Sequence, residues 1–210
     1  MLSSFLYSLC RCYLCLIRKL RRRFWQWYQV QFLRHTSGVK LSDHRKLFFK
    51  DKCVFKIENG AYVCLGQNVY INSGGETSFP TPSKIAVAPG ASLTIGDNSG
   101  ISTTSIICKS SVSIGDNVNV GAGTLILDSN MHSLDWRVRM HREKDCSIDS
   151  KKAPVVIEDN AFIGARCIIT KGVTIGRNAI VAAGSVVVKS IPANAIAGGN
   201  PCKIIKVIES

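Results

Sequence analysis

The sequence predicts an all-β fold, a parallel β-helix of stacked coils preceded by a helical segment. Aliphatic residues recur every six positions in the C-terminal part, whereas residues 2–24 carry apolar residues at helical spacing. Charge divides the chain in the same way, because residues 1–50 hold 11 of the 27 Lys and Arg and one of the 14 acids. We therefore expect two parts, residues 1–50 and residues 51–210.

The composition bounds the function classes before any motif is considered. With 46% hydrophobic and 20% charged residues, a wholly disordered chain is excluded. The net charge of +13 would suit a nucleic-acid-binding protein, but no recognised binding motif accompanies it. Nucleic acid is therefore not an expected partner.

The N-terminal segment predicts a basic helix with bulky aromatic residues. Such a helix fits the interface of an anionic membrane, and it would place a cytoplasmic enzyme peripherally on the inner face of the cell membrane. Packing on the body with a solvated basic face is the alternative. No charge precedes the apolar run and no small-residue cleavage site follows it, unlike a secretory signal. The apolar residues at a spacing of three or four are Leu2, Phe5, Leu6, Leu9, Tyr13, Leu16, Leu20 and Phe24.

The nine cysteines do not form a disulfide framework, because their number is odd and their spacing is irregular. We expect reduced thiols, with Cys108 and Cys167 filling the core. Cys10, Cys12 and Cys15 lack partners at zinc spacing, and their acylation is an open alternative.

A six-residue period organises the body. Such a period suits a short strand followed by a tight corner, and three such sides close a coil of about 18 residues around a column of inward aliphatic residues. Ile95, Ile101 and Ile107 share this spacing, and a step of seven leads on to Ile114. Ile57, Val63 and Val69 also share it, as do Ile114, Val120 and Ile126. The unbroken series after Pro154 is Ile157, Ile163, Ile169, Ile175, Val181 and Val187.

The segment Thr174–Ile205, TIGRNAIVAAGSVVVKSIPANAIAGGNPCKII, resembles the C-terminal signature of the hexapeptide-repeat acyltransferases. The resemblance is to the branch with galactoside, maltose and serine acetyltransferases, and is closest to the O-acetyltransferases of surface-polysaccharide assembly. It covers about residues 54–208. It implies a left-handed β-helix, acetyl-CoA as co-substrate, and a homotrimer with sites between neighbouring subunits.

The repeat is interrupted by the polar segment 128–154, and an insertion of this kind in a rigid repeat is usually a functional loop. A neutral imidazole suits removal of a hydroxyl proton during acyl transfer. His132 lies in a D-x-N-x-H-S-x-D run that resembles the family's active-site stretch, which implies that it is the general base. His141, within a basic run, is expected to be a solvated loop residue. The candidates to orient His132 are Asp128, Asn130 and Asp135.

Acceptor binding is expected from the same loop and from neighbouring coils. Trp136, Arg137 and Arg139 could cover a sugar face and contact its anionic groups, although a solvated loop is the alternative. In the resembling family an Asn one coil upstream binds the acceptor or oxyanion. This sequence has Thr103 and Thr104 near that place. Phe162 stands where related enzymes commonly have Trp.

Small residues recurring one coil apart would let the pantetheine arm of the donor approach the backbone. Corner geometry alone explains the same residues, and both interpretations can hold together. In the resembling enzymes these positions line the CoA groove, and basic residues near the C-terminus meet the nucleotide phosphates. The corresponding residues are Gly164, Ala165, Ala182, Ala183, Gly184 and Ser185, with Lys203 and Lys206 as the basic pair.

Taken together, the sequence predicts an acetyl-CoA-dependent O-acetyltransferase. The expected acceptor is a sugar hydroxyl of a surface-polysaccharide or lipid-linked glycan precursor. N-acetylation of an amino sugar and a non-catalytic β-helix scaffold are the alternatives. No metal is expected, because a zinc enzyme on this fold would need three His ligands from adjacent coils, and only His132 and His141 lie in or beside the coils.

Overall fold

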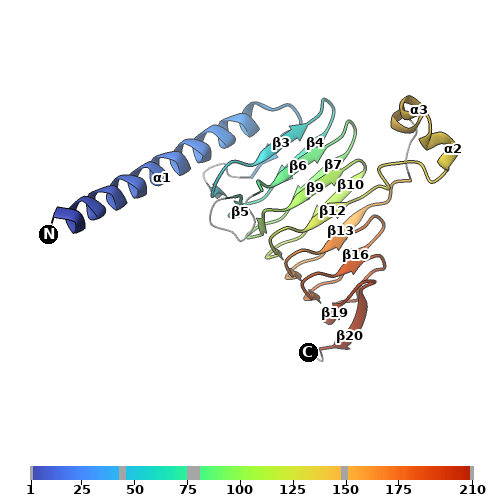
Figure 1. Ribbon diagram of the computed structural model, residues 1–210. Coiled ribbons are helices and arrows are strands. Elements are labelled where there is room, and N and C mark those ends of the chain that lie inside the picture. Colours follow the sequence, from blue (N-terminus) through green and yellow to red (C-terminus); the bar gives the residue numbers. More distant parts are fainter. Residues whose placement is uncertain (1, 43–45, 75–80, 148–150, 209–210) are drawn as a thin grey trace.

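The computed structural model describes residues 2–42, 46–74, 81–147 and 151–208. It is a left-handed parallel β-helix with one long helix, α1 (Leu2–His35), that extends from its N-terminal end (Figure 1). The first coil begins at β1 (Val39–Leu41), ahead of the boundary near residue 50 that the charge distribution suggested. The basic residues after His35 therefore belong partly to the β-helix.

Three flat sheets form the sides of the β-helix, and as far as β18 every third strand along the chain adds to the same sheet. Sheet I contains β1, β4 (Tyr62–Leu65), β7 (Ser92–Ile95), β10 (Ser111–Ile114), β13 (Val155–Ile157) and β16 (Thr174–Ile175). Sheet II contains β2 (Leu47–Phe49), β5 (Val69–Asn72), β8 (Gly100–Ser102), β11 (Asn119–Val120), β14 (Phe162–Ile163), β17 (Ile180–Val181), β19 (Ala195–Gly198) and the antiparallel β20 (Lys203–Val207). Sheet III contains β3 (Val54–Ile57), β6 (Lys84–Val87), β9 (Ser105–Cys108), β12 (Leu125–Leu127), β15 (Ile168–Ile169) and β18 (Val186–Val187).

The register confirms the predicted coil length in the last coils. Ile157 pairs with Ile175, and Ile163 pairs with Val181, so that equivalent positions are 18 residues apart. All four side chains are buried in the core. The inward column thus repeats from coil to coil, and each coil covers the apolar end of the one before it.

One inward position in the predicted column is wrong. Ile106, not Ile107, pairs in register with Ile85 and Ile126 and is fully buried. The step from Ile101 to Ile106 is five residues rather than six. Most strands of four residues also bury two side chains, such as Leu93 and Ile95, since alternate residues face the same side of a strand.

The corner between sheets I and II is built from stacked Asp and Asn residues. Asn160 donates to Asn178 at 3.1 Å, and Asn178 donates to Asn194 at 2.8 Å. All three have φ between 56° and 59°, a left-handed conformation that Asn tolerates better than most residues. In the same corner, the backbone N–H of Asp116 donates to Asp159 of the next coil at 3.0 Å. These side chains therefore tie successive corners together.

Helix α1 caps the first coil with two glutamine side chains. Gln29 accepts from the N–H of Cys53 at 2.6 Å and donates to the carbonyl of Asp51 at 3.0 Å. Gln26 accepts from the N–H of Phe49 at 2.6 Å and donates to the carbonyl of Leu47. Buried Leu33 lies on the same side of the helix. The two amides thus satisfy backbone groups that a preceding coil would otherwise pair.

The expectations for the cysteines and for a membrane-crossing helix can be compared with the structure. Cys108 and Cys167 are buried in the core as predicted, and burial raises the pKa of the Cys108 thiol to about 12. The side chains of Cys10 and Cys12 lie outside the described residues. Within the described chain, α1 included, no helix has an apolar stretch long enough to cross a bilayer.

The capping role of Gln29 is open to a direct test. We expect Gln29→Ala to lower the free energy of unfolding by about 1–3 kcal/mol, because it leaves a buried N–H and a carbonyl unpaired. Gln31→Ala is the matched control and should cost less than about 0.5 kcal/mol. Urea denaturation followed by circular dichroism measures both. Equal losses from the two variants would contradict the cap.

Candidate functional site

The predicted loop leaves the β-helix at the corner between sheets III and I, after β12 and before β13. Its neck is closed by an antiparallel bridge between Ser129 and Lys152, and the N–H of Ala153 donates to the carbonyl of Asp128 at 3.0 Å. The loop carries two short helices, α2 (Trp136–Arg139) and α3 (Arg142–Ser147), which lie to the side of the coils (Figure 1). Across it, β10 pairs with β13 without a change of register.

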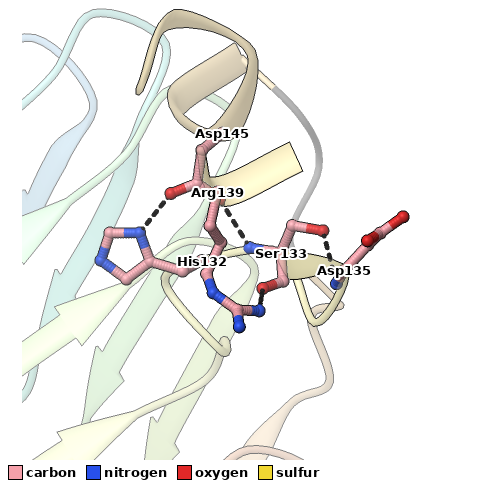
Figure 2. Close-up of polar contacts among 5 residues, drawn as sticks. All are labelled: His132, Ser133, Asp135, Arg139 and Asp145. Atoms are coloured by element: carbon pink, nitrogen blue, oxygen red, sulfur yellow. Dashed lines mark hydrogen bonds and ion pairs between the residues drawn. The ribbon is translucent and has the colours of Figure 1, made fainter. Parts of the chain in front are cut away.

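His132 and Asp145 form a close pair inside this loop (Figure 2). Nδ1 of His132 lies 2.6 Å from Oδ2 of Asp145, and the other carboxylate oxygen accepts from the N–H of Ser133 at 2.8 Å. The His132 side chain is 65% exposed, whereas that of Asp145 is 8% exposed. With Nδ1 held by the carboxylate, Nε2 is the ring nitrogen that can exchange a proton with a bound molecule.

The surroundings of Asp145 keep its carboxylate ionised. The hydrogen bond from the N–H of Ser133, followed by that from His132, holds the pKa of Asp145 below its ordinary value, and the charge of Arg139 acts in the same direction. Arg139 also donates to the carbonyl of Ser133 at 2.6 Å. A carboxylate that is anionic at neutral pH is the partner that an imidazole needs when it becomes positively charged.

The residue just before His132 has an unusual backbone conformation. Met131 has φ = 65°, in the left-handed region, where a side chain other than Gly costs about 1 kcal/mol or more. The backbone just before His132 thus has a conformation that is uncommon for Met.

Three residues were predicted as candidates to orient His132, and in the structure each of them contacts another group. Asp128 is fully buried and accepts from the N–H groups of Lys109 at 2.8 Å and Ser110 at 2.6 Å. The N–H of Asn130 donates to the carbonyl of Lys151 at 3.3 Å, at the neck. Asp135 caps α2 by accepting from the N–H of Arg137 at 2.9 Å.

Asp145 therefore holds His132, in the role that was predicted for the nearer residues Asp128, Asn130 and Asp135. It lies 13 positions after His132 and returns to it through the fold of α2 and α3. The sequence signal that could have suggested it is weak, since it consists of an acid within a basic run.

The outer side of the loop presents an aromatic ring beside a cation. Trp136 is exposed on α2, and the guanidinium carbon of Arg137 lies 5.1 Å from the centre of its ring. His141 is exposed on the same loop, as expected for a solvated residue. Trp136 and Arg137 are exposed, so that a bound molecule could contact them. Arg139 instead donates to the carbonyl of Ser133.

Thr103 and Thr104 lie elsewhere, in the corner between sheets II and III. Both are buried. The Thr103 hydroxyl accepts from the N–H of Gly123 at 3.1 Å, and the Thr104 hydroxyl donates to the carbonyl of Ser102 at 3.0 Å. Their hydroxyls thus serve the corner itself. Phe162 is exposed on the outer face of sheet II.

The small residues that were expected to line a donor groove share the corner between sheets II and III. Gly164 is buried there, and a Cβ on it would lie 2.5 Å from the backbone nitrogen of Ala183, so close stacking requires glycine. Ser185 is also buried, and its hydroxyl donates to the carbonyl of Ala182 at 2.6 Å. The remaining small residues at this corner, Ala165, Ala182, Ala183 and Gly184, reach the surface.

Lys203 and Lys206 lie on the exposed strand β20. This strand pairs antiparallel with β19 and is the last strand of sheet II. The structure thus places the candidate residues on two different edges of the β-helix. The His132 loop is on the edge between sheets III and I, and the small residues are on the edge between sheets II and III. A single chain does not bring the two sets together. Among the described residues, no three His, Cys, Asp or Glu side chains are grouped as a metal site would need.

Comparison with known proteins identifies the repeat. Residues 92–127 and 154–189 match the family described as the hexapeptide repeat of succinyl-transferase, and the loop lies between the matched segments. The chain is 52% identical over 54 residues to a 2,3,4,5-tetrahydropyridine-2,6-dicarboxylate N-acetyltransferase of Staphylococcus aureus, a match that covers 26% of this chain and 23% of that protein. A Clostridium perfringens protein of the same name is 50% identical over 58 residues, which are 28% of this chain and 25% of that protein. The matches thus span about a quarter of these curated relatives.

Solved structures share the fold over about three quarters of this chain. The acetyltransferase VCA0836 from Vibrio cholerae, complexed with acetyl-CoA, is 26% identical with a TM-score of 0.52, over 74% of this chain and 72% of that chain. The polySia-specific acetyltransferase NeuO has a TM-score of 0.59 at 23% identity, over 78% of this chain and 73% of that chain, and shows the common fold.

The buried contacts of Asp128 predict a structural role. We expect Asp128→Ala to lower the free energy of unfolding by about 3 kcal/mol, because it leaves the N–H groups of Lys109 and Ser110 without their charged acceptor. Asp135→Ala removes an exposed helix cap and should cost about 1 kcal/mol or less. Thermal and urea denaturation compare the two. An Asp128→Ala protein as stable as the unmodified protein would contradict this assignment.

Proposed function

Because the chain has the hexapeptide repeat and the left-handed β-helix of the hexapeptide-repeat acyltransferases, we propose that it is an acetyl-CoA-dependent acetyltransferase. The single observation that carries the proposal is the His132–Asp145 pair, with a mostly exposed imidazole on a buried carboxylate. This pair can accept one proton and return it, which is the chemistry that acyl transfer to a hydroxyl or amine needs.

In the proposed reaction both substrates bind together and the acetyl group passes directly between them. Nε2 of His132 takes the proton from the acceptor as its oxygen or nitrogen attacks the thioester carbon. The carbon–sulfur bond then breaks, and the imidazolium returns the proton to the departing thiolate of CoA. Asp145 accepts a hydrogen bond from Nδ1 throughout and stabilises the positive ring. The N–H of Ser133 holds the carboxylate of this pair.

The donor is proposed to lie along the corner between sheets II and III. Ala182, Ala183 and Gly184 are small and exposed there, so a pantetheine arm could approach the backbone closely. Lys203 and Lys206, on the neighbouring strand β20, offer cations to the phosphates. Gly164 and Ser185 contribute indirectly, because they are buried and shape the corner rather than facing the donor.

The separation of the two edges supports a homotrimer. If three copies pack side by side with their β-helix axes parallel to a common threefold axis, the loop edge of one copy can face the small-residue edge of the next. Each of the three sites would then take His132 from one copy and its donor corner from a neighbour. Thr103 and Thr104, buried in their own corner, would not contact the acceptor in this arrangement.

The proposed acceptor is a sugar hydroxyl, within a surface-polysaccharide or lipid-linked glycan precursor. The supporting observation is the exposed Trp136 ring beside the Arg137 guanidinium, since sugars stack on aromatic faces and Arg suits their phosphate or carboxylate groups. N-acetylation of an amine is the second candidate, favoured by the names of the Staphylococcus and Clostridium relatives. The same base would serve either acceptor.

The activity is tested by release of the CoA thiol from acetyl-CoA with a panel of sugar nucleotides, oligosaccharides and amino sugars. We expect His132→Ala to lower kcat about 100- to 10,000-fold, because the base is lost. Asp145→Asn should lower kcat less, by about 10- to 1,000-fold, with KM little changed, since it disturbs the orientation and charge of the ring. NMR of the product distinguishes an ester from an amide.

His141→Ala is the matched control, an exposed histidine on the same loop, and it should keep the unmodified rate. Acceptor-dependent thiol release that survives His132→Ala would overturn the role of the base. The absence of release with every acceptor would favour a non-catalytic scaffold.

A further inference from the structure

Helix α1 has an apolar face that no other part of the described chain covers. We define the outer stripe as Tyr13, Leu16, Ile17, Leu20, Phe24 and Trp27, all of which are exposed large side chains. Apart from the adjacent Leu16 and Ile17, successive members are three or four residues apart, which places them on one side of the helix. Tyr13 and Trp27 are 63% and 61% exposed, even though they are large and mostly apolar. A continuous exposed row of this kind marks an interaction surface.

The body of the protein cannot cover this stripe. The residues that pack on the first coil, Gln26, Gln29, Val30 and Leu33, fall on the opposite side of the helix. Toward its N-terminus, α1 also extends beyond the coils (Figure 1). The stripe therefore needs a partner other than the domain to which the helix is attached.

The charge of α1 indicates the chemistry of that partner. The helix contains seven Lys and Arg residues and no Asp or Glu. Lys19 and Arg23 are exposed on one flank of the outer stripe, and Arg21, on the other flank, forms an ion pair with Asp51 at 2.8 Å. Apolar and aromatic side chains flanked by cations match the anionic interface of a phospholipid bilayer, where rings sit at headgroup level and long basic side chains reach phosphates.

We propose that α1 binds the surface of an anionic phospholipid bilayer through the outer stripe, lying in the interface with its basic flanks toward the headgroups. A second copy of the chain is a poorer partner, because a bundle of these helices would bring seven positive charges from each chain together without an acid to offset them. Phosphates of a nucleic acid would meet the cations but leave the apolar stripe uncovered.

The fold also determines how the enzyme would be held at this surface. The glutamine cap and the Arg21–Asp51 pair join the second half of α1 to the first coil. The N-terminal end of the β-helix would thus face the lipid, while β20 lies at the far end of the coils (Figure 1). The inference does not rest on the proposed acetyltransferase activity, because it uses contacts and charges of α1 alone.

The test is flotation of the full-length reduced protein with vesicles of 30% phosphatidylglycerol and 70% phosphatidylcholine, against vesicles of phosphatidylcholine alone. We expect binding at least about tenfold stronger with the anionic vesicles, weakening as salt is raised. Leu20→Glu with Phe24→Glu should reduce binding at least about tenfold, because both substitutions place charge in the outer stripe. Val188→Glu with Ile208→Glu is the matched control, with the same change of charge on exposed apolar residues of the last coils.

A second readout locates the contact. In protein with Trp25→Phe and Trp136→Phe, Trp27 is the remaining tryptophan, and its emission should shift to shorter wavelength when anionic vesicles are added. Circular dichroism of each variant excludes loss of folding as the cause.

Three results would overturn the proposal. One is equal binding to neutral and anionic vesicles, and another is unchanged binding when Leu20 and Phe24 are both Glu. The third is the absence of vesicle binding together with a smaller oligomer for that variant in light scattering, which would assign the outer stripe to another copy of the chain.

Discussion

The in-register stacking of one coil on the next is the constraint on which the rest of this structure depends. A strand of two to four residues is too short to be stable by itself, and each one is held by backbone hydrogen bonds to strands of neighbouring coils. Side chains can vary on the outside, and the number of residues per coil varies at the corners, while the paired strands stay in register. Val112 pairs with Val155 across the whole inserted loop, which shows how strictly the coil keeps its path.

This constraint explains why the His132–Asp145 pair lies in the loop, apart from the residues that pack inside the coils. Inside the coils, polar groups serve the stack, as the buried carboxylate of Asp128 does for the corner at Lys109 and Ser110. Outside, the loop is free to fold on itself, and there a His can be paired with an Asp without disturbing the core. The first coil has no coil before it, and α1 supplies the missing backbone partners through Gln26 and Gln29. The outer stripe of the same helix is not covered by any other described part of the chain, and we propose that it binds a bilayer surface.

Much of the fold could be predicted from the sequence because the repeat is a one-dimensional signal. The six-residue period predicted the coil, the bounds of the loop and the burial of Cys108 and Cys167. It failed locally at Ile107, since a five-residue corner after Ile101 moves the inward position to Ile106. The site was harder, because Asp145 reaches His132 through two short helices whose folding leaves no period in the sequence. Gly164 and Ser185 are small because the coils stack closely at their corner, and not because they line a surface groove.

In the proposed assembly, a complete active site combines the His132 loop of one copy with the small-residue corner of another. Complementation between two inactive variants tests it most directly. His132→Ala removes the base, and Ala183→Trp, at the exposed corner, blocks the donor. If sites form between copies, co-assembly of equal amounts restores one half times one half, about a quarter, of the thiol-release activity. Mixed assemblies that stay as inactive as the two separate variants would contradict the claim.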